Sequence, residues 1–152
     1  MISSLIPLAL ALAAAPAAPT PQSLPAIVVR ANNLQLHVQV ARTPGERERG
    51  LMYVTRLPRH HGMLFVFDGD APVAFWMKDT LIPLDMVFVG ADAIVRTVFA
   101  NVKVVPATLP DSQIPLEQAQ AKYVIELPAG EARMDRLRTG SRIDGLPGAG
   151  AP

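Results

Sequence analysis

The sequence predicts a single, mainly β domain, either an antiparallel β-sandwich or a closed barrel with one or two short helices. Three observations support this fold class. The chain has 152 residues, which is enough for one core and too few for two ordinary domains. Short runs rich in Val, Ile and Phe recur between turn-forming residues, as in strands. Between these strands we find no helix long enough for a crossover, so we expect mostly antiparallel pairing.

The N-terminal residues differ in composition from the rest of the chain. No charged side chain precedes Arg30. The apolar run at 2–15 ends in small residues that fit an A-x-A cleavage pattern, which predicts a signal peptide over residues 1–17. No Lys or Arg precedes this run, so an uncleaved membrane anchor is the alternative, although two prolines interrupt the run and a spanning helix needs roughly 18 apolar residues. We therefore expect export to the periplasm or the cell exterior, with membrane contact only through this segment if it stays uncleaved.

The other boundaries follow from composition. Residues 18–25 form a proline-rich spacer that we expect to stay extended, residues 26–145 form the β domain, and residues 146–152 form a flexible tail. The formal net charge is +1, which gives no strong positive field for a nucleic acid. The chain contains no cysteine, so thiolate metal sites, cysteine nucleophiles and disulfides are all excluded.

Local patterns predict the elements of the domain. Thr43 and Glu46 form a capping box with a proline at the first helical position, which predicts a short helix from Pro44 to about Met52. A turn at Asn32-Asn33 joins the first two strands, and Gly130 to Leu137 has room for one or two helical turns. The expected strands are 26–30, 34–41, 63–67, 73–77, 84–89, 94–105 with a break near Asn101, 123–127 and 140–143.

The segment order of the chain resembles a bacterial and archaeal family called domain of unknown function 192. The resemblance spans roughly residues 34–143 and rests on four groups of residues. They are Gly50-Leu51-Met52, Gly62 to Phe67, Phe75 to Lys78 followed by Thr80 to Asp85, and Ile125-Glu126-Leu127 with Gly130. The resemblance implies a single, mainly β domain that is often exported, and it implies no established activity. The chain departs from the family pattern at Asp79, Val54 and Ser141, where Asn, Arg and Asp are common.

Residues 73–89 contain the candidate binding residues. Alternation along a strand places Trp76 and Lys78 on the same face. Asp85 lies beside apolar residues on both faces of its strand, so burial would require a cation or backbone donors to compensate its charge. Lys78, across the intervening turn, is the partner that we expect. Trp76, Lys78, Asp79 and Asp85 are therefore our predicted ligand-binding residues.

Three functions fit these residues. The first is binding of a small ligand or an envelope protein around Trp76 to Asp85. The second is an envelope hydrolase that uses Asp79, Asp85 or Glu126, although no motif identifies a catalytic residue. The third is a scaffold in which Asp85 accepts hydrogen bonds from backbone N–H groups, Lys78 is a surface charge and Trp76 fills the core. For Asp85 itself the structural interpretation is favoured, since buried carboxylates that fasten loops are common. The function that we predict is the binding module.

The sequence does not predict a metal site. Imidazole and thioether ligands suit copper outside the cytoplasm, and the chain offers three histidines and several methionines. However, adjacent histidines in a loop are usually solvated, and methionines in apolar strands usually fill gaps in the core. The residues concerned are His37, His60, His61, Met52, Met63, Met77, Met86 and Met134. We expect no metal and no cofactor.

Overall fold

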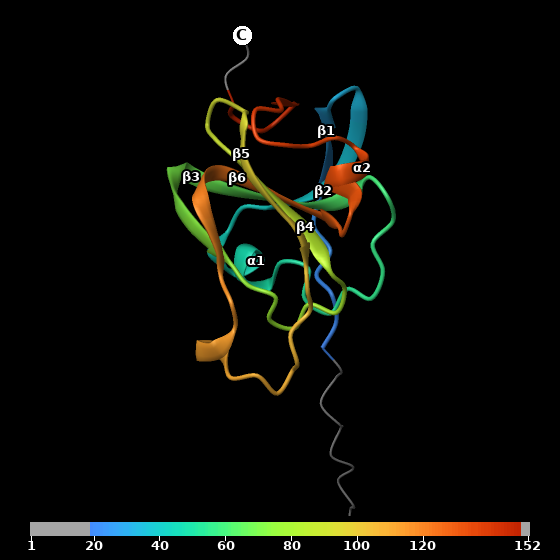
Figure 1. The fold of residues 1–152 in the computed structure, drawn as a ribbon, viewed down its shortest axis with the longest axis vertical. Helices are drawn as coiled ribbons and strands as arrows, with labels where there is room; N and C mark the ends of the chain where they lie inside the picture. Colours follow the sequence, from blue (N-terminus) through green and yellow to red (C-terminus); the bar gives the residue numbers. More distant parts are fainter. Residues whose placement is uncertain (1–18, 150–152) are drawn as a thin grey trace, which may run out of the picture.

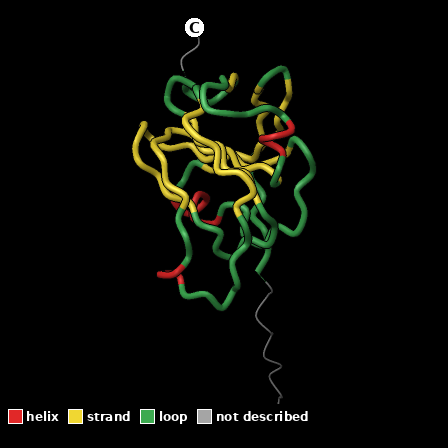
Figure 2. The backbone as a smooth tube through the Cα atoms, viewed as in Figure 1, coloured by secondary structure: helices red, strands yellow, loops and turns green. Residues whose placement is uncertain are grey.

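The computed structural model describes residues 19–149, so the predicted signal peptide at 1–17 lies outside the described residues. One seven-stranded sheet has the strand order β5-β4-β6-β3-β2-β1-β7. Its strands are β1 (Ala26–Ala31), β2 (Leu34–Ala41), β3 (His61–Phe75), β4 (Leu84–Val89), β5 (Val95–Val102), β6 (Glu117–Pro128) and β7 (Ile143–Asp144). Two short helices, α1 (Pro44–Arg49) and α2 (Glu131–Met134), and the 3₁₀ turn η1 (Asp111–Gln113) complete the fold (Figure 2). Over residues 19–149, no helix has the length and apolar character needed to cross a membrane.

The sheet is a curled, mixed half-barrel, which corrects the predicted antiparallel sandwich or closed barrel (Figure 1). The neighbours β2 and β3 run parallel, because the chain crosses between them through residues 42–60, which include α1. Parallel neighbours require such a crossover. Near the outermost strands, the segments at 93–95 and 140–143 meet through a bridge between Ile94 and Arg142 and through backbone hydrogen bonds, such as the 2.8 Å bond from Val95 N to Ser141 O and the 2.9 Å bond from Ile143 N to Ala93 O.

Two of the local predictions are confirmed in detail. Asn32 and Asn33 have φ angles of 48° and 69°, the left-handed conformation that Asn tolerates in a tight hairpin turn. In α1, Glu46 N donates to Thr43 Oγ1 over 3.3 Å and Thr43 N donates to Glu46 Oε2 over 2.9 Å. This is the reciprocal capping box, and it places the start of α1 at Pro44.

The strand β3 replaces two predicted strands. Its pairing with β6 continues on both sides of an irregularity between Val66 and Ala71, so Asp68-Gly69-Asp70 bulges from one strand rather than ending it. Turn-forming residues produce bulges as readily as turns when the partner strand is continuous. The bend lets β3 curve along with the sheet.

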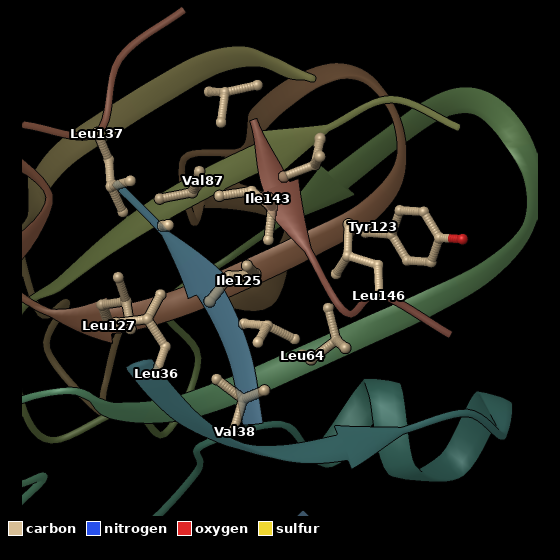
Figure 3. Packing of buried hydrophobic residues seen from close by; sticks show 14 of the residues in the cluster. Leu36, Val38, Leu64, Val87, Tyr123, Ile125, Leu127, Leu137, Ile143 and Leu146 are labelled. Carbon is tan, nitrogen blue, oxygen red and sulfur yellow. The ribbon is translucent and has the colours of Figure 1, made fainter. Parts of the chain in front are cut away.

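The sheet buries apolar residues on both faces. All seven strands contribute to the interior of the half-barrel (Figure 3), whose core includes Val29, Leu36, Val38, Leu64, Val87, Val95, Tyr123, Ile125, Leu127 and Ile143. The outer face of β3, β4 and β6 packs against the segment after α1 and the connection between β3 and β4 through Leu51, Met63, Phe65, Phe75, Met77, Leu84, Met86, Phe88 and Val124. Side-chain alternation along β6 therefore sends neighbouring residues into two different cores.

Both flanking segments contact the domain. In the predicted spacer, Gln22 Nε2 donates to Glu46 O and Gly50 O over 2.9 Å each, so this stretch follows the domain surface. At the start of the predicted tail, Leu146 is buried and Pro147 O accepts a 2.8 Å hydrogen bond from the Tyr123 hydroxyl. The last three residues, 150–152, lie outside the described range.

Candidate functional site

Three of the four predicted binding residues lie in one surface groove. Trp76, Lys78 and Asp79 follow directly after β3, where the chain leaves the sheet and passes α1. The groove has a volume of about 330 Å³ and is lined by Gly45, Glu48, Arg49, Met52, Tyr53, Trp76, Lys78 and Asp79. We call it the Trp76 groove. Sequence reasoning missed the α1 side of this groove because the charges of that helix have the pattern of an ordinary solvated face.

One wall of the Trp76 groove is held by hydrogen bonds between Tyr53 and Asp79. Tyr53 N donates to Asp79 O over 2.9 Å, and the Tyr53 hydroxyl donates to Asp79 Oδ2 over 3.1 Å. The hydrogen bond to Asp79 raises the pKa of Tyr53. Both residues adopt left-handed backbone angles, with φ of 65° and 51°, a conformation that Asp and Asn accept at lower cost than most residues. The position of Asp79 in the loop therefore depends on Tyr53.

Lys78 pairs with Asp111 of η1, not with Asp85 as the sequence led us to expect. The hydrogen bond to Asp111 raises the pKa of Lys78. Lys78 Nζ also lies 5.3 Å from the centre of the Trp76 ring, within the range of a cation–π contact. The Lys78 side chain therefore covers one edge of the Trp76 indole while its charge stays at the surface.

Asp85 does not belong to the groove. Its side chain is fully buried, Oδ1 accepts a 2.7 Å hydrogen bond from Asn101 N, and Oδ2 accepts a 2.8 Å hydrogen bond from Ala132 N. On β4 it alternates with Met86, so it faces the interior of the half-barrel. Two backbone N–H groups, from β5 and α2, take the place of the ion pair expected between Lys78 and Asp85. The spacing between residues 78 and 85 could not reveal these donors, because both come from segments further along the chain. This is the loop-fastening arrangement of the structural interpretation.

Glu126 lies on the opposite face of the sheet from Asp85. It is paired in register with Met63 on one side and Met86 on the other, and its residue exposure is 4%. Glu126 lines a cavity of about 30 Å³, enough for one water-sized group. That cavity shares Glu48, Arg49, Met52, Trp76 and Lys78 with the groove. Glu126 therefore faces the outer-face core and not solvent.

The chemical state of Glu126 follows from its surroundings. Burial among apolar groups disfavours the charged carboxylate and raises the pKa of Glu126 to about 8. At neutral pH the side chain is therefore mostly a carboxylic acid, which donates one hydrogen bond and accepts others. A buried neutral carboxyl group that lines a cavity beside a groove is the arrangement found in many binding and catalytic sites.

The histidines and methionines considered for copper are distributed over different parts of the molecule. The rings of His37 and His61 stack with their centres 5.1 Å apart. Met63 on β3, Met86 on β4 and Met77 just after β3 are all buried in the outer-face core, where methionine fills irregular gaps.

Comparisons with known proteins show two similar structures and one family. A protein from Sinorhizobium meliloti 1021, described as a candidate transcription regulator, has a solved structure that is 34% identical with a TM-score of 0.71, over 81% of this chain and 95% of that one. A protein of unknown function from Novosphingobium aromaticivorans DSM 12444 is 29% identical with a TM-score of 0.71, over 87% of this chain and 94% of that one. A search among curated proteins finds no match. The model of domain of unknown function 192, described as "uncharacterized ACR", matches residues 27–145, and the chain belongs to this family.

Proposed function

We propose that this protein is an exported module that binds a small ligand in the Trp76 groove. The observation that carries the proposal is that an aromatic surface groove adjoins the cavity of a buried carboxyl group, Glu126, and shares five lining residues with it. Concave sites that combine a flat apolar wall with a few placed polar groups are the usual architecture of ligand binding. Export remains part of the proposal and depends on the N-terminal segment.

The lining of the groove indicates the chemistry of the ligand. The Trp76 indole offers a flat apolar wall, and charges of both signs stand around it on Glu48, Arg49, Lys78 and Asp79. A mixed set of this kind favours a ligand with both donors and acceptors over a strongly charged one. The Glu126 cavity admits one small group, and the protonated carboxyl would donate to an acceptor there, such as a hydroxyl or carbonyl oxygen.

An envelope hydrolase is the second candidate, and one observation favours it. A carboxyl group with a pKa near 8 is protonated at neutral pH and so suits a general acid. Asp79, on the groove wall, would then be the second carboxylate. Asp85 drops out of this hypothesis, because both of its oxygens accept backbone hydrogen bonds on the other face of the sheet.

Binding of nucleic acid is not favoured, despite the description of the Sinorhizobium protein as a candidate regulator. The formal net charge of this chain is +1, whereas phosphate backbones are attracted by clustered positive charge. In the Trp76 groove, the acidic Glu48 and Asp79 balance Arg49 and Lys78.

The test is a thermal-shift screen of the folded domain against envelope metabolites, peptides and glycans. A ligand that binds only the native state raises the melting temperature by mass action. The chain contains one tryptophan, so the intrinsic fluorescence of Trp76 reports directly on occupancy of the groove. We expect each genuine ligand to raise the melting temperature and to change this fluorescence.

Variants assign the binding to the groove. Trp76→Leu should abolish the thermal shift, and Glu126→Leu should weaken it, while Glu126→Gln, which keeps a donor, should retain most of it. Leu81→Ala is the matched control, since Leu81 lies exposed on the same connection without lining the groove. A ligand that stabilises Trp76→Leu as well as wild type would contradict the proposed site. If wild type hydrolyses a ligand and Glu126→Gln does not, that result would favour the hydrolase.

A further inference from the structure

A second cluster of ionisable side chains lies away from the Trp76 groove, where the turn before β3 meets α2. His60, Glu131 and Asp135 each offer one potential ligand atom, and these three atoms lie within 4.8 Å of one another. His60 Nε2 lies 3.6 Å from Glu131 Oε1 and 3.5 Å from Asp135 Oδ2. Two carboxylates and one imidazole thus converge on one point.

The local fold explains this convergence. Glu131 begins α2 and Asp135 follows its last residue, and Asp135 N donates to Glu131 O over 2.8 Å. One helical turn places side chains four residues apart on the same side. His60 arrives from the other direction, in a turn with φ of 59°, and its carbonyl oxygen accepts a 2.7 Å hydrogen bond from His37 N. The cluster therefore joins segments about 70 residues apart in the chain, which no sequence spacing reveals.

Polar atoms in this cluster are buried without a partner among the described residues. They are His60 Nε2, Glu131 Oε2 and Asp135 Oδ2. The Glu131 side chain has 0% exposure and the Asp135 side chain 4%. Buried polar atoms nearly always find a hydrogen-bond partner, and charged ones left alone carry the larger cost. Three such atoms lie in this cluster, one on each side chain, and a bound cation would compensate all of them.

In each carboxylate, one oxygen has a contact outside the cluster or with the backbone, and the other oxygen is buried without a hydrogen-bond partner. Glu131 Oε1 accepts a hydrogen bond from His60 N, and Asp135 Oδ1 lies 3.7 Å from Arg59 Nη2. Outer contacts of this kind commonly fix the ligands of a metal site. The Arg59 side chain is 60% exposed, so solvent screens its charge and it compensates the two buried carboxylates only in part.

We propose that His60, Glu131 and Asp135 bind a divalent transition-metal ion of the Zn²⁺ class. Imidazole and carboxylate ligands suit Zn²⁺ and similar ions, whereas Mg²⁺ and Ca²⁺ prefer oxygen alone. Tetrahedral ligands at Zn²⁺ bond lengths stand roughly 3.4 Å apart, close to the 3.5 Å between His60 Nε2 and Asp135 Oδ2. Three protein ligands leave a fourth position for water or another ligand. The proposal is independent of the Trp76 groove and departs from our expectation of no metal.

The cluster lies close to the protein surface. The His60 side chain is 33% exposed, and Asp135 lines a surface hollow of about 590 Å³ together with Asn32, Leu34, Met134, Arg136, Arg138 and Ser141. Once bound, the ion would tie α2 to the turn before β3. Since Ala132 of α2 also donates to Asp85, the metal would strengthen the same end of the half-barrel.

The experiment uses the folded, tag-free protein, depleted of metal by chelation and dialysis. Zn²⁺, Mn²⁺ and Mg²⁺ are added separately, and calorimetry and the melting temperature follow binding. We expect one Zn²⁺ per chain, a higher melting temperature with Zn²⁺ and no response to Mg²⁺ at the same concentration. Co²⁺ should give the visible absorption of a low-coordinate site in wild type.

Variants distinguish this site from other causes of zinc binding. Glu131→Gln keeps the size of the side chain and His60→Asn keeps a polar side chain without the ring; each should weaken Zn²⁺ binding by about tenfold or more. His61→Asn is the matched control, because His61 is the neighbouring histidine and stacks on His37 outside the cluster; it should bind as wild type does. Equal loss in His61→Asn would place the metal at the stacked histidines and overturn the proposal. No Zn²⁺ response in folded wild type would instead identify the cluster as an ion pair.

Discussion

Asp85 and Glu126 are buried carboxylic acids on neighbouring central strands, and they differ in how the protein compensates them. Both oxygens of Asp85 accept hydrogen bonds from backbone N–H groups, one from β5 and one from the start of α2. Glu126 projects from the opposite face, between two methionines, and burial raises its pKa to about 8. One acid is fastened into the scaffold by backbone donors, and the other is held neutral beside a cavity.

Burial alone does not mark a functional carboxylate. Strand alternation places Asp85 and Glu126 in two different cores, and hydrogen-bond satisfaction then separates their roles. A carboxylate with both oxygens occupied has little capacity for a ligand, whereas an unpaired neutral acid retains a donor. The candidate site therefore keeps the predicted residues Trp76, Lys78 and Asp79, and Glu126 takes the place of Asp85.

The largest expected effect is on the scaffold acid. Asp85→Asn keeps one acceptor but turns an NH₂ group toward one of the two backbone donors, which leaves buried N–H groups facing each other. We expect a loss of about 3 kcal/mol in the free energy of unfolding, equivalent to roughly 10 °C in melting temperature for a domain of this size. Chemical and thermal denaturation measure it.

Asp79→Asn is the control for this prediction. The amide oxygen of the new side chain would still accept from the Tyr53 hydroxyl, and asparagine tolerates the left-handed backbone angle, so we expect only a small change in melting temperature. If Asp85→Asn had the melting temperature of wild type, the two backbone hydrogen bonds would not stabilise the positions of β5 and α2. The structural role that we assign to Asp85 would then be wrong.

The sequence predicts the elements of this fold better than their assembly. The strands β1, β2 and β4 and the capping box of α1 follow from local alternation and turn chemistry, which act over a few residues. The parallel pairing of β2 with β3 does not, because it depends on the path of residues 42–60. In the same way, the partner of Lys78 comes from η1, which lies 33 residues further along the chain.

The candidate sites show the same limit. Trp76, Lys78 and Asp79 are close in sequence, and the groove contains all three. Glu126 could be assigned to the face opposite Ile125 and Leu127, but what covers that face depends on the packing of the segment after α1. For the cluster around Glu131, short-range patterns carry no signal, because His60 comes from a distant turn.

The next largest effect is on the acid beside the cavity. The folded state binds the Glu126 proton more tightly than the unfolded chain does, since its pKa rises from 4.5 to about 8. The stabilisation from this group is therefore complete below pH 4.5 and is lost as the pH rises toward 8. Relative to Glu126→Gln, wild type should lose roughly 2 to 3 kcal/mol of stability between pH 5 and 7.

Denaturation at several pH values measures this difference, and subtraction of the variant removes the contributions of other titrating groups. Glu48→Gln provides the control, since Glu48 also lines the cavity but is exposed to solvent. Parallel stability curves for wild type and Glu126→Gln would mean that Glu126 is ionised in the folded protein, and its proposed role as a hydrogen-bond donor would fail.

The smallest expected effect is on Lys78, the residue that the sequence predicts as the partner of Asp85. Lys78 pairs with Asp111, whose side chain is 57% exposed, and solvent-exposed ion pairs contribute little to stability. Lys78→Met keeps the apolar stem over Trp76, so we expect its melting temperature to stay within about 1 °C of wild type. Asp111→Asn should likewise keep the melting temperature of wild type. Added salt should not change the differences in melting temperature among wild type and the two variants. A loss in Lys78→Met as large as that in Asp85→Asn, without one in Asp111→Asn, would show that Lys78 compensates a buried carboxylate after all.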